Sequence, residues 1–247
     1  MRYLVLSDIH SNLEALDACL ADARTRGYDQ AVILGDVIGY GADPNAVVAR
    51  LQELQPLAMV RGNHDKISLG MQEADGFNSV AVAAAEWTLT ALGANQRAWV
   101  AALPRGPVPV DEVVEICHGA PYDEDAYVFD EMDAIRAFES LTHPVCLYGH
   151  THCPVVFSLA NGVLRGEPVE PRVESRVPFA DATKYLINPG SVGQPRDGDA
   201  RAAYGIVDTA AKAIDLLRVP YPVQAAQDKI IRAGLPRVLA DRLSKGR

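Results

Sequence analysis

Residues 3–20, YLVLSDIHSNLEALDACL, contain the structural unit from which the fold can be predicted. The apolar run at 4–6 is typical of a buried strand, and a polar segment follows it. Leucines then recur at helical spacing. Asn12 suits the helix N-cap, and Gly27 lies where such a helix should end. The stretch therefore predicts a strand, a loop and a helix.

The same unit recurs along the chain. AVIL at 31–34 predicts a second strand, and a loop at 35–43 leads to Pro44, which opens a helix running through Leu54. A third strand is predicted at 57–60, directly before RGNHD. Strands that alternate with helices indicate βαβ units and a parallel sheet.

The rest of the chain has a different pattern. Residues 66–110 predict a helical insertion with Ala-rich helices at 78–92 and 95–103, which could serve as a lid or as an interface. Later strands are predicted at 113–117, 145–148, 155–159, 185–187, 203–207 and 212–218. These strands have little helix between them, which favours antiparallel pairing. A helical segment at 221–247 follows, and we expect a single domain over residues 1–247.

Composition excludes several protein classes. The 23 basic and 32 acidic residues give a net charge of −9, so the chain lacks the general electrostatic signature of a nucleic-acid-binding protein. No apolar run approaches the roughly 18 residues of a membrane span. The 4 cysteines form no C-x-x-C pair, and no signal peptide is recognised at the N-terminus, so a cytoplasmic protein is expected. A homo-oligomer is left open.

Polar residues gather directly after the predicted strands. In α/β folds, ligands bind outside the carboxyl ends of the strands, so residues there are candidates for a site. The residues concerned are Asp8, His10, Asp36, Asn63, His64, His118, His150 and His152. A lone Asp-x-His is usually a loop or cap, but five independent strand ends with such residues favour a metal site. Of the 6 histidines, only His143 falls outside the set.

The residue types indicate the chemistry. Without thiolates, a closed structural zinc site is disfavoured, whereas carboxylate, imidazole and amide ligands suit Mn, Fe or Zn in open sites. The set is too large for one tetrahedral ion and suits two ions about 3.5–4 Å apart that share a carboxylate. Such a pair activates a water molecule and neutralises phosphate charge, which predicts phosphoryl transfer.

Five ordered motifs carry a resemblance to a known family. They are Asp8-Ile9-His10, Gly35-Asp36, Gly62-Asn63-His64-Asp65, His118-Gly119 and Gly149-His150-Thr151-His152. Together the motifs resemble the five blocks of the calcineurin-like metallophosphoesterase superfamily. The segment NPGSVGQPR at 188–196 is similar to one in its small prokaryotic YfcE-like phosphodiesterase branch.

The resemblance implies a four-layer α/β/β/α sandwich of two mixed sheets with a dinuclear site at one end. It assigns Asp8, His10 and His152 to one metal ion. It assigns Asn63, His118 and His150 to the other, with Asp36 bridging. The resemblance also places His64 near the leaving group, as general acid or as hydrogen-bond donor in the transition state. Two divalent ions are expected, with Mn first and Fe, Zn, Ni or Mg as alternatives.

Two departures from related sequences narrow the function. Phosphoprotein phosphatases follow Gly-Asp with a further Asp and an Arg, where this chain has Gly39 and Tyr40. His64 therefore lacks its usual orienting carboxylate, and the protein phosphatase reading is weakened. Several YfcE-like members carry Cys at the position of His64, so the retained histidine keeps general-acid assistance available.

Other residues are weaker candidates. Arg61 and Arg196 could bind substrate phosphate, because guanidinium pairs with phosphate bidentately, or could form surface ion pairs. Tyr40 is expected to be exposed. Further expectations concern capping or second-sphere roles for Asn12 and Asn188, buried inert thiols at Cys117 and Cys153, and a solvated basic C-terminal helix face.

We therefore predict a metal-dependent hydrolase of phosphate esters, and preferentially a phosphodiesterase on a small substrate. The resemblance implies in-line attack by a hydroxide that bridges two metal ions. A phosphomonoesterase or protein phosphatase is the alternative within the enzymes. A non-catalytic metal-binding scaffold is the alternative from another class.

Overall fold

Two six-stranded mixed sheets form the centre of the computed structural model, which describes residues 1–170 and 172–247. The first sheet has the order β3 (Ala58–Met59), β2 (Gln30–Ile33), β1 (Arg2–Leu6), β11 (Ala202–Asp208), β12 (Ala213–Val219) and β9 (Glu174–Pro178). The second has the order β4 (Val108–Pro109), β5 (Val114–Ile116), β6 (Val145–Leu147), β10 (Thr183–Asn188), β7 (Val155–Ala160) and β8 (Val163–Pro168). Strands β1, β2 and β3 are parallel, whereas β1, β11, β12 and β9 pair antiparallel.

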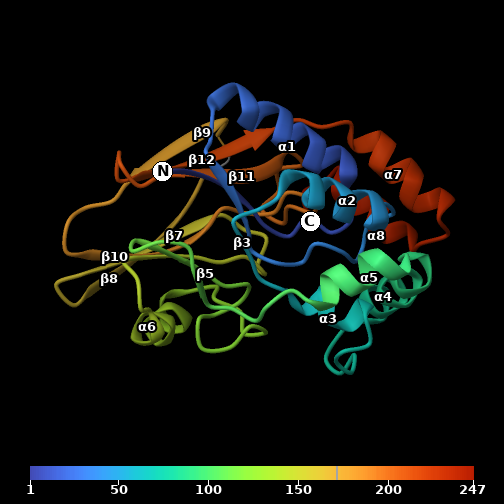
Figure 1. The fold of residues 1–247 in the computed structure, drawn as a ribbon, viewed down its shortest axis with the longest axis horizontal. Helices are drawn as coiled ribbons and strands as arrows, with labels where there is room; N and C mark the ends of the chain where they lie inside the picture. Colours follow the sequence, from blue (N-terminus) through green and yellow to red (C-terminus); the bar gives the residue numbers. More distant parts are fainter. Residues whose placement is uncertain (171) are drawn as a thin grey trace.

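Helices cover the outer faces of the two sheets (Figure 1). The helices on the side of the first sheet are α1 (Leu13–Arg26), α2 (Pro44–Leu54), α7 (Val223–Arg232) and α8 (Arg237–Leu243). Helix α6 (Glu131–Ser140) lies beneath the second sheet. Helices α4 (Ser79–Ala91) and α5 (Ala94–Ala101) pack beside α2, and the short α3 (Asn63–Ser68) follows β3. The predicted α/β architecture of two mixed sheets is confirmed.

The alternation of side chains along the strands produces three cores between four layers. On β1, Leu4 and Leu6 pack toward the helices, while Tyr3 and Val5 pack between the sheets. On β6, Cys146 faces α6, and its two strand neighbours face the core between the sheets. Strands that are buried on both faces read as continuous apolar runs, which explains why the sequence pattern found them.

Several elements were missed by the sequence prediction. They are α3, α6 and the strands β4, β8 and β9. Strands β8 and β9 are largely exposed and carry mixed polar residues, so they lack an apolar run. Helix α6 has a signal that could have found it, because Asp130 caps its first turn and Ala134, Ala137 and Phe138 form a buried stripe.

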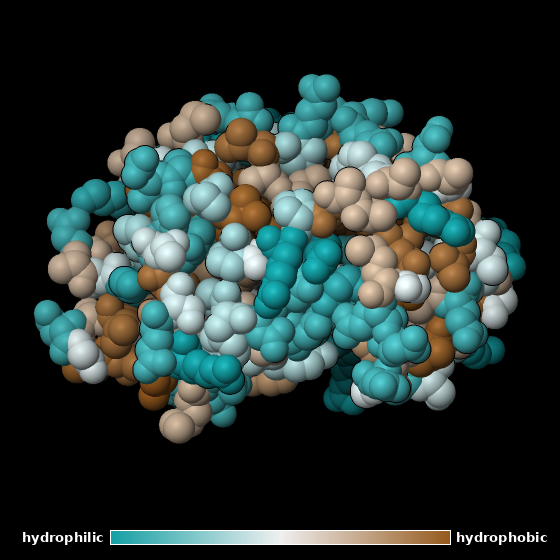
Figure 2. Space-filling model, turned by 60° about the horizontal axis from the view of Figure 1, so that its bottom comes forward, coloured by the Kyte–Doolittle hydropathy of each residue, from teal (hydrophilic) through white to brown (hydrophobic). Residues whose placement is uncertain are grey.

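The predicted helical segments are present with small shifts at their ends. Helix α4 lies within the predicted 78–92, α5 begins one residue before the predicted 95–103, and α7 and α8 lie within 221–247. Among the described residues, no helix has the length and apolarity needed to cross a bilayer. Hydrophilic groups gather across the middle of the face seen in Figure 2, and hydrophobic groups are dispersed around them.

Candidate metal centre

The predicted ligands converge at the carboxyl ends of strands from both sheets. Asp8 and His10 follow β1, and Asp36 follows β2. Asn63 begins α3, directly after β3. His118 follows β5, while His150 and His152 follow β6. All seven side chains are buried, so the chain folds this polar set inside rather than leaving it in solvent.

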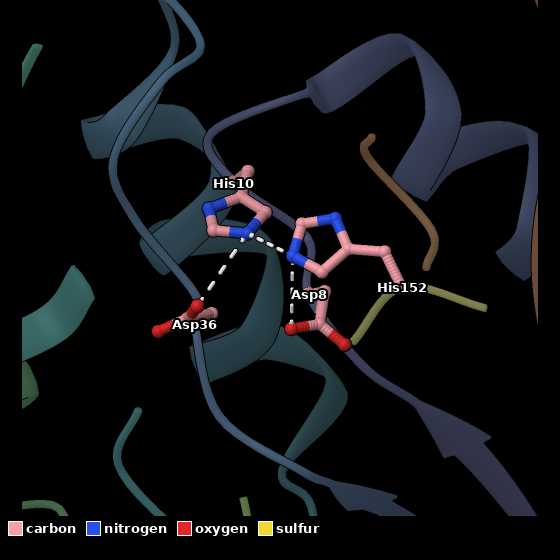
Figure 3. Close-up of side chains that lie close together, drawn as sticks. All are labelled: Asp8, His10, Asp36 and His152. Atoms are coloured by element: carbon pink, nitrogen blue, oxygen red, sulfur yellow. Dashed lines mark hydrogen bonds and ion pairs between the residues drawn. The ribbon is translucent and has the colours of Figure 1, made fainter. Parts of the chain in front are cut away.

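A first cluster contains Asp8, His10, Asp36 and His152 (Figure 3). The Nε2 atom of His10 lies 3.1 Å from Nε2 of His152 and 3.5 Å from Oδ2 of Asp36. The same nitrogen of His152 lies 3.4 Å from Oδ1 of Asp8. One potential ligand atom from each residue lies within 4.8 Å of all the others, which is the spacing of a metal site.

A second cluster shares Asp36 with the first and adds His118 and His150. The Nε2 atom of His118 lies 3.4 Å from Oδ2 of Asp36 and 3.1 Å from Nδ1 of His150. Oδ1 of Asn63 lies 3.2 Å from the same His118 nitrogen. The two clusters thus bring together the residues that the resemblance assigns to each ion, with Asp36 in both.

Asp36 provides a test of whether a cation fits here. Its Oδ1 accepts a hydrogen bond from the backbone N–H of His64 at 2.9 Å, but its Oδ2 is buried without a hydrogen-bond partner among the described residues. A buried, unpaired carboxylate oxygen is costly. Because this oxygen faces nitrogens of both clusters, a pair of cations held between the clusters fits the residues present.

The far nitrogens of the histidines are held by backbone carbonyls. Nδ1 of His118 donates to Leu34 O at 2.8 Å, and Nδ1 of His152 donates to Gln194 O at 2.6 Å. Such bonds fix the tautomer, so the lone pair of the opposite nitrogen faces the cluster. Sequence reasoning missed Gln194, because a backbone acceptor carries no residue-type signal.

Five ligand residues adopt the left-handed backbone conformation. The φ angles are 51° for Asp8, 49° for His10, 51° for Asp36, 70° for His150 and 61° for His152. Non-glycine residues are uncommon there, and such strain gathers at functional sites. Neighbouring glycines allow close approach, since a Cβ at Gly62 would collide with the Asp36 carboxylate and one at Gly149 with the side chains of Ser7 and Asp8.

The electrostatics of the centre suit cation binding. Burial lowers the pKa values of His10, His150 and His152 well below the ordinary range. Burial alone would raise the pKa of Asp36, but the charge of His118 outweighs it and holds that pKa well below its usual value. Burial would lower the pKa of His118, but the charge of Asp36 outweighs burial and raises that pKa to about 10. Neutral imidazoles and ionised carboxylates bind metal ions, so a cation bound at His118 would displace its proton.

His64 lies beside the centre without an orienting carboxylate. Its Nδ1 is buried and has no hydrogen-bond partner among the described residues. The sequence predicted this, because Gly39 and Tyr40 stand at the positions of the usual Asp and Arg. Instead, the rings of Tyr40 and Phe77 pack at centroid distances of 4.2 and 5.4 Å. Burial lowers the pKa of His64 to about 4, so its ring is neutral near pH 7. Asp65, which sequence reasoning did not weigh, accepts from the N–H groups of Gly62 and Ile38 and ties two ligand loops together.

The two candidate arginines have different surroundings. Arg61 donates two hydrogen bonds to Glu124, at 3.0 and 2.9 Å. Arg196 donates its backbone N–H to His152 O at 3.3 Å and its guanidinium to Gln194 Oε1 at 3.1 Å. Its guanidinium carbon lies 5.9 Å from the centroid of the Tyr40 ring.

Other expectations are met or corrected. Tyr40, expected to be exposed, is buried with only 6% of its surface accessible, because its ring packs on His10 at 4.8 Å. Cys117 is buried as expected, but Cys153 is only half-buried. Asn12 caps α1 by accepting from Ala15 N–H, and its amide also donates to Gly193 O.

Asn188 holds the loop that carries two of the histidines. Its amide donates to Gly149 O at 2.7 Å and to Thr151 Oγ1 at 3.0 Å. The sequence left open whether Asn188 is a turn residue or a support for the ligands. The contacts assign it to the loop that positions His150 and His152.

A cavity of about 220 Å³ adjoins the second cluster. It is lined by Asn63, Gln72, Asp75, Gly76, Phe77, Asp125, Tyr127 and His150. Tyr127 stacks on His150 with a centroid distance of 3.8 Å and an interplanar angle of 20°. Sequence reasoning missed Phe77 and Tyr127, because both lie in loops without a motif.

The sequence of the chain is similar to a known protein family and to a known protein. A family model described as the calcineurin-like phosphoesterase superfamily domain matches residues 1–212. An uncharacterised protein of Methanocaldococcus jannaschii is 37% identical, over 98% of this chain and 97% of its own length.

Two solved structures resemble the whole chain. A metallophosphoesterase from Sphaerobacter thermophilus is 35% identical, with a TM-score of 0.86 over 100% of this chain and 99% of that one. A hypothetical protein from Pyrococcus horikoshii, at 18% identity, shares the fold with a TM-score of 0.78 over 100% of this chain and 98% of that one.

Proposed function

The chain belongs to the calcineurin-like phosphoesterase superfamily, and from this premise we propose that it is a phosphodiesterase that uses two divalent cations. The observation that carries the proposal is the pair of ligand clusters joined by the unpartnered oxygen of Asp36. Mn is the cation we propose, because mixed carboxylate, imidazole and amide ligands suit it. The free cysteines support a reducing compartment such as the cytoplasm.

When bound, the cations would neutralise phosphate charge and activate a water molecule. His10, His150 and His152 would hold them as neutral imidazoles, and His118 would give up its proton on binding a cation. Backbone carbonyls behind the four rings orient them. His64 reaches the edge of the centre as a neutral ring, so its role is to donate a hydrogen bond to a phosphate or leaving-group oxygen. The surrounding burial keeps bulk water from competing for these contacts.

Two features favour a diester over a monoester. A diester needs space for two ester groups, and the cavity beside Asn63 and His150 offers room for one of them next to the aromatic rings of Phe77 and Tyr127. The acidic side chain of Asp75 on that cavity disfavours a second negative charge there, whereas Asp125 is paired with Lys66.

The proposal is tested with chelator-treated protein to which Mn²⁺ is returned. Bis(p-nitrophenyl) phosphate and p-nitrophenyl phosphate share a leaving group, so their relative kcat/KM values separate diester from monoester preference. We expect activity that depends on Mn²⁺ and favours the diester. A preference for the monoester would favour the phosphatase alternative. Two bound metal ions per chain without turnover of either ester would favour the scaffold.

A further inference from the structure

Two guanidinium groups meet beside the first cluster, one from the loop after β10 and one from the C-terminal helix α8. Arg196 Nη2 and Arg242 Nη1 each donate to Gln194 Oε1 at 3.1 Å. Each guanidinium carbon lies 5.9 Å from the centroid of the Tyr40 ring. Sequence reasoning placed Arg242 on a solvated helix face, whereas the structure half-buries it next to the centre.

This pair of like charges has no acidic partner among the described residues. The Nε atom of each arginine is buried without a hydrogen-bond partner in that part of the chain. Nearby carboxylates are engaged by other cations: Asp197 by Arg218, Asp199 by Arg201, Asp43 by Lys229 and Asp241 by Arg237. Burial and the charge of Arg196 lower the pKa of Arg242.

The pair is coupled to the metal centre but is not part of it. Gln194 accepts from both guanidinium groups through its side chain and from His152 Nδ1 through its backbone carbonyl. The Tyr40 ring, near both arginines, also packs on His10 and His64. In the described residues neither guanidinium donates to a ligand side chain, so an anion held by the pair would lie next to the reacting phosphate and not on the cations.

We propose that Arg196 and Arg242 form a subsite for a second phosphate group of the substrate. The proposal deepens the proposed function, on which its substrate class rests: a phosphoric diester that carries a further phosphate. Guanidinium pairs suit phosphate because they offer several charge-assisted hydrogen bonds in a fixed plane. The cavity on the other cluster presents the acidic Asp75, so the arginine side is where a second anion is favoured.

The anion subsite is tested first without metal or catalysis. Chelator-treated protein is unfolded thermally in sodium sulfate and in sodium chloride of equal ionic strength. We expect sulfate to raise the Tm of the wild type and of Arg237→Gln, an exposed arginine on the same helix, more than chloride does. Because sulfate stabilises folded proteins generally, Arg242→Gln should show a clearly smaller sulfate-specific increase in Tm than the wild type and Arg237→Gln. The same increase in Arg242→Gln as in the wild type would overturn the subsite.

The substrate class is tested with Mn²⁺ and a pair of chromogenic diesters. They are the p-nitrophenyl ester of thymidine 5′-phosphate and the same compound with an additional 3′-phosphate. We expect the 3′-phosphate to raise kcat/KM of the wild type by about tenfold, mainly through KM, and Arg242→Gln to abolish that advantage. Arg242→Lys, which keeps the charge, should retain part of it and serves if the Gln variant does not fold.

The outcomes separate the two proposals. An equal loss on both diesters in Arg242→Gln would mean that the pair grips the reacting phosphate, and would overturn the second-phosphate subsite. An advantage of the 3′-phosphate that survives in Arg242→Gln would also overturn it. If no ester is hydrolysed, the proposed phosphodiesterase fails, while the sulfate measurement still decides whether the arginines bind an anion.

Discussion

Arg61 and Arg196 are the same residue type beside the same centre, yet the structure uses them differently. Arg61, after β3, is held bidentately by Glu124, which also binds the buried Lys66 at 3.0 Å. Among the described residues, the guanidinium of Arg196, after β10, donates only to the neutral amide oxygen of Gln194. An arginine beside the centre is therefore available to bind phosphate only if no carboxylate from another segment of the chain already forms an ion pair with it.

The largest loss of activity is expected from substitution of Asp36, which both ligand clusters share. Asp36→Asn removes the charge that both ligand clusters share, so kcat/KM should fall by roughly a thousandfold and bound Mn²⁺ should decrease. Metal analysis and diester hydrolysis measure the two losses. Asp17→Asn, on the surface of α1, is the control and should behave as wild type. Full activity in Asp36→Asn would refute a shared bridging carboxylate.

The two arginines themselves give the next largest contrast. Arg196→Gln should lower kcat/KM by about tenfold on the diester with the additional 3′-phosphate, and little on the diester without it, since a charge-assisted hydrogen bond to the second phosphate is lost. Arg61→Gln should change it less than about threefold, because Glu124 already neutralises that guanidinium. Steady-state kinetics on both variants measure the ratio. Equal losses would erase the distinction between the two arginines.

The acid that holds Arg61 should matter for stability more than for catalysis. Glu124→Gln leaves Lys66 buried with less compensating charge, and we expect unfolding by urea to cost about 2 kcal/mol less at pH 7. Diester hydrolysis at 25 °C should stay within about twofold of the wild type. A large loss of turnover without loss of stability would instead place Glu124 in catalysis.

Glu124 also predicts a pH dependence. Burial would raise its pKa, but hydrogen bonds from Arg61 and Lys66 outweigh burial and lower it. A carboxyl with a lowered pKa in the folded state stabilises the fold above its unfolded pKa of about 4.3, and this contribution is lost as the pH falls through the folded pKa. The stability difference between wild type and Glu124→Gln should therefore shrink below pH 4 in urea titrations. A stability difference between the two proteins that stays constant down to pH 3 would contradict a lowered pKa of Glu124.

The smallest effect is expected from the hydroxyl of Tyr40. Tyr40→Phe keeps the ring that packs on His10 and His64, so kcat/KM should change less than about threefold. Tyr40→Ala removes the ring and should lower both Tm and kcat/KM, as large cavities in a buried site do. Thermal unfolding and kinetics on the pair isolate the role of the ring. A large loss in Tyr40→Phe would assign a role to the hydroxyl instead.

The candidate ligands could be predicted from the sequence because each follows a strand that an apolar run predicts. Asp8 and Asp36 come directly after apolar runs, and the topology of parallel strands brings their loops to one edge. The partners of Arg61 could not be predicted in this way, since Glu124 lies 63 residues along the chain in a loop with no periodic pattern. The burial of Tyr40 likewise depends on the rings of His10 and His64, which come from two separate segments of the chain.

Contacts that depend on how the helices pack were the hardest to predict from the sequence. Arg242 reads as one of many charges on an amphipathic helix, and only the docking of α7 and α8 against the first sheet brings it to Gln194. Whether residues 66–110 serve as a lid or as an interface stays a prediction. Helices α4 and α5 in this segment contribute Ala81, Ala84 and Val100 to the helix-side core.

The family model ends at residue 212, before α7 and α8, whereas every candidate metal ligand lies before residue 153. The candidate ligands are therefore separate, along the sequence, from the helix that brings Arg242 beside them. Under the proposed subsite, changes in the last two helices alter substrate preference and leave the loops of the candidate ligands untouched. A chimaera that grafts other terminal helices onto residues 1–219 would change which phosphate compounds are accepted before it changed how they are cleaved.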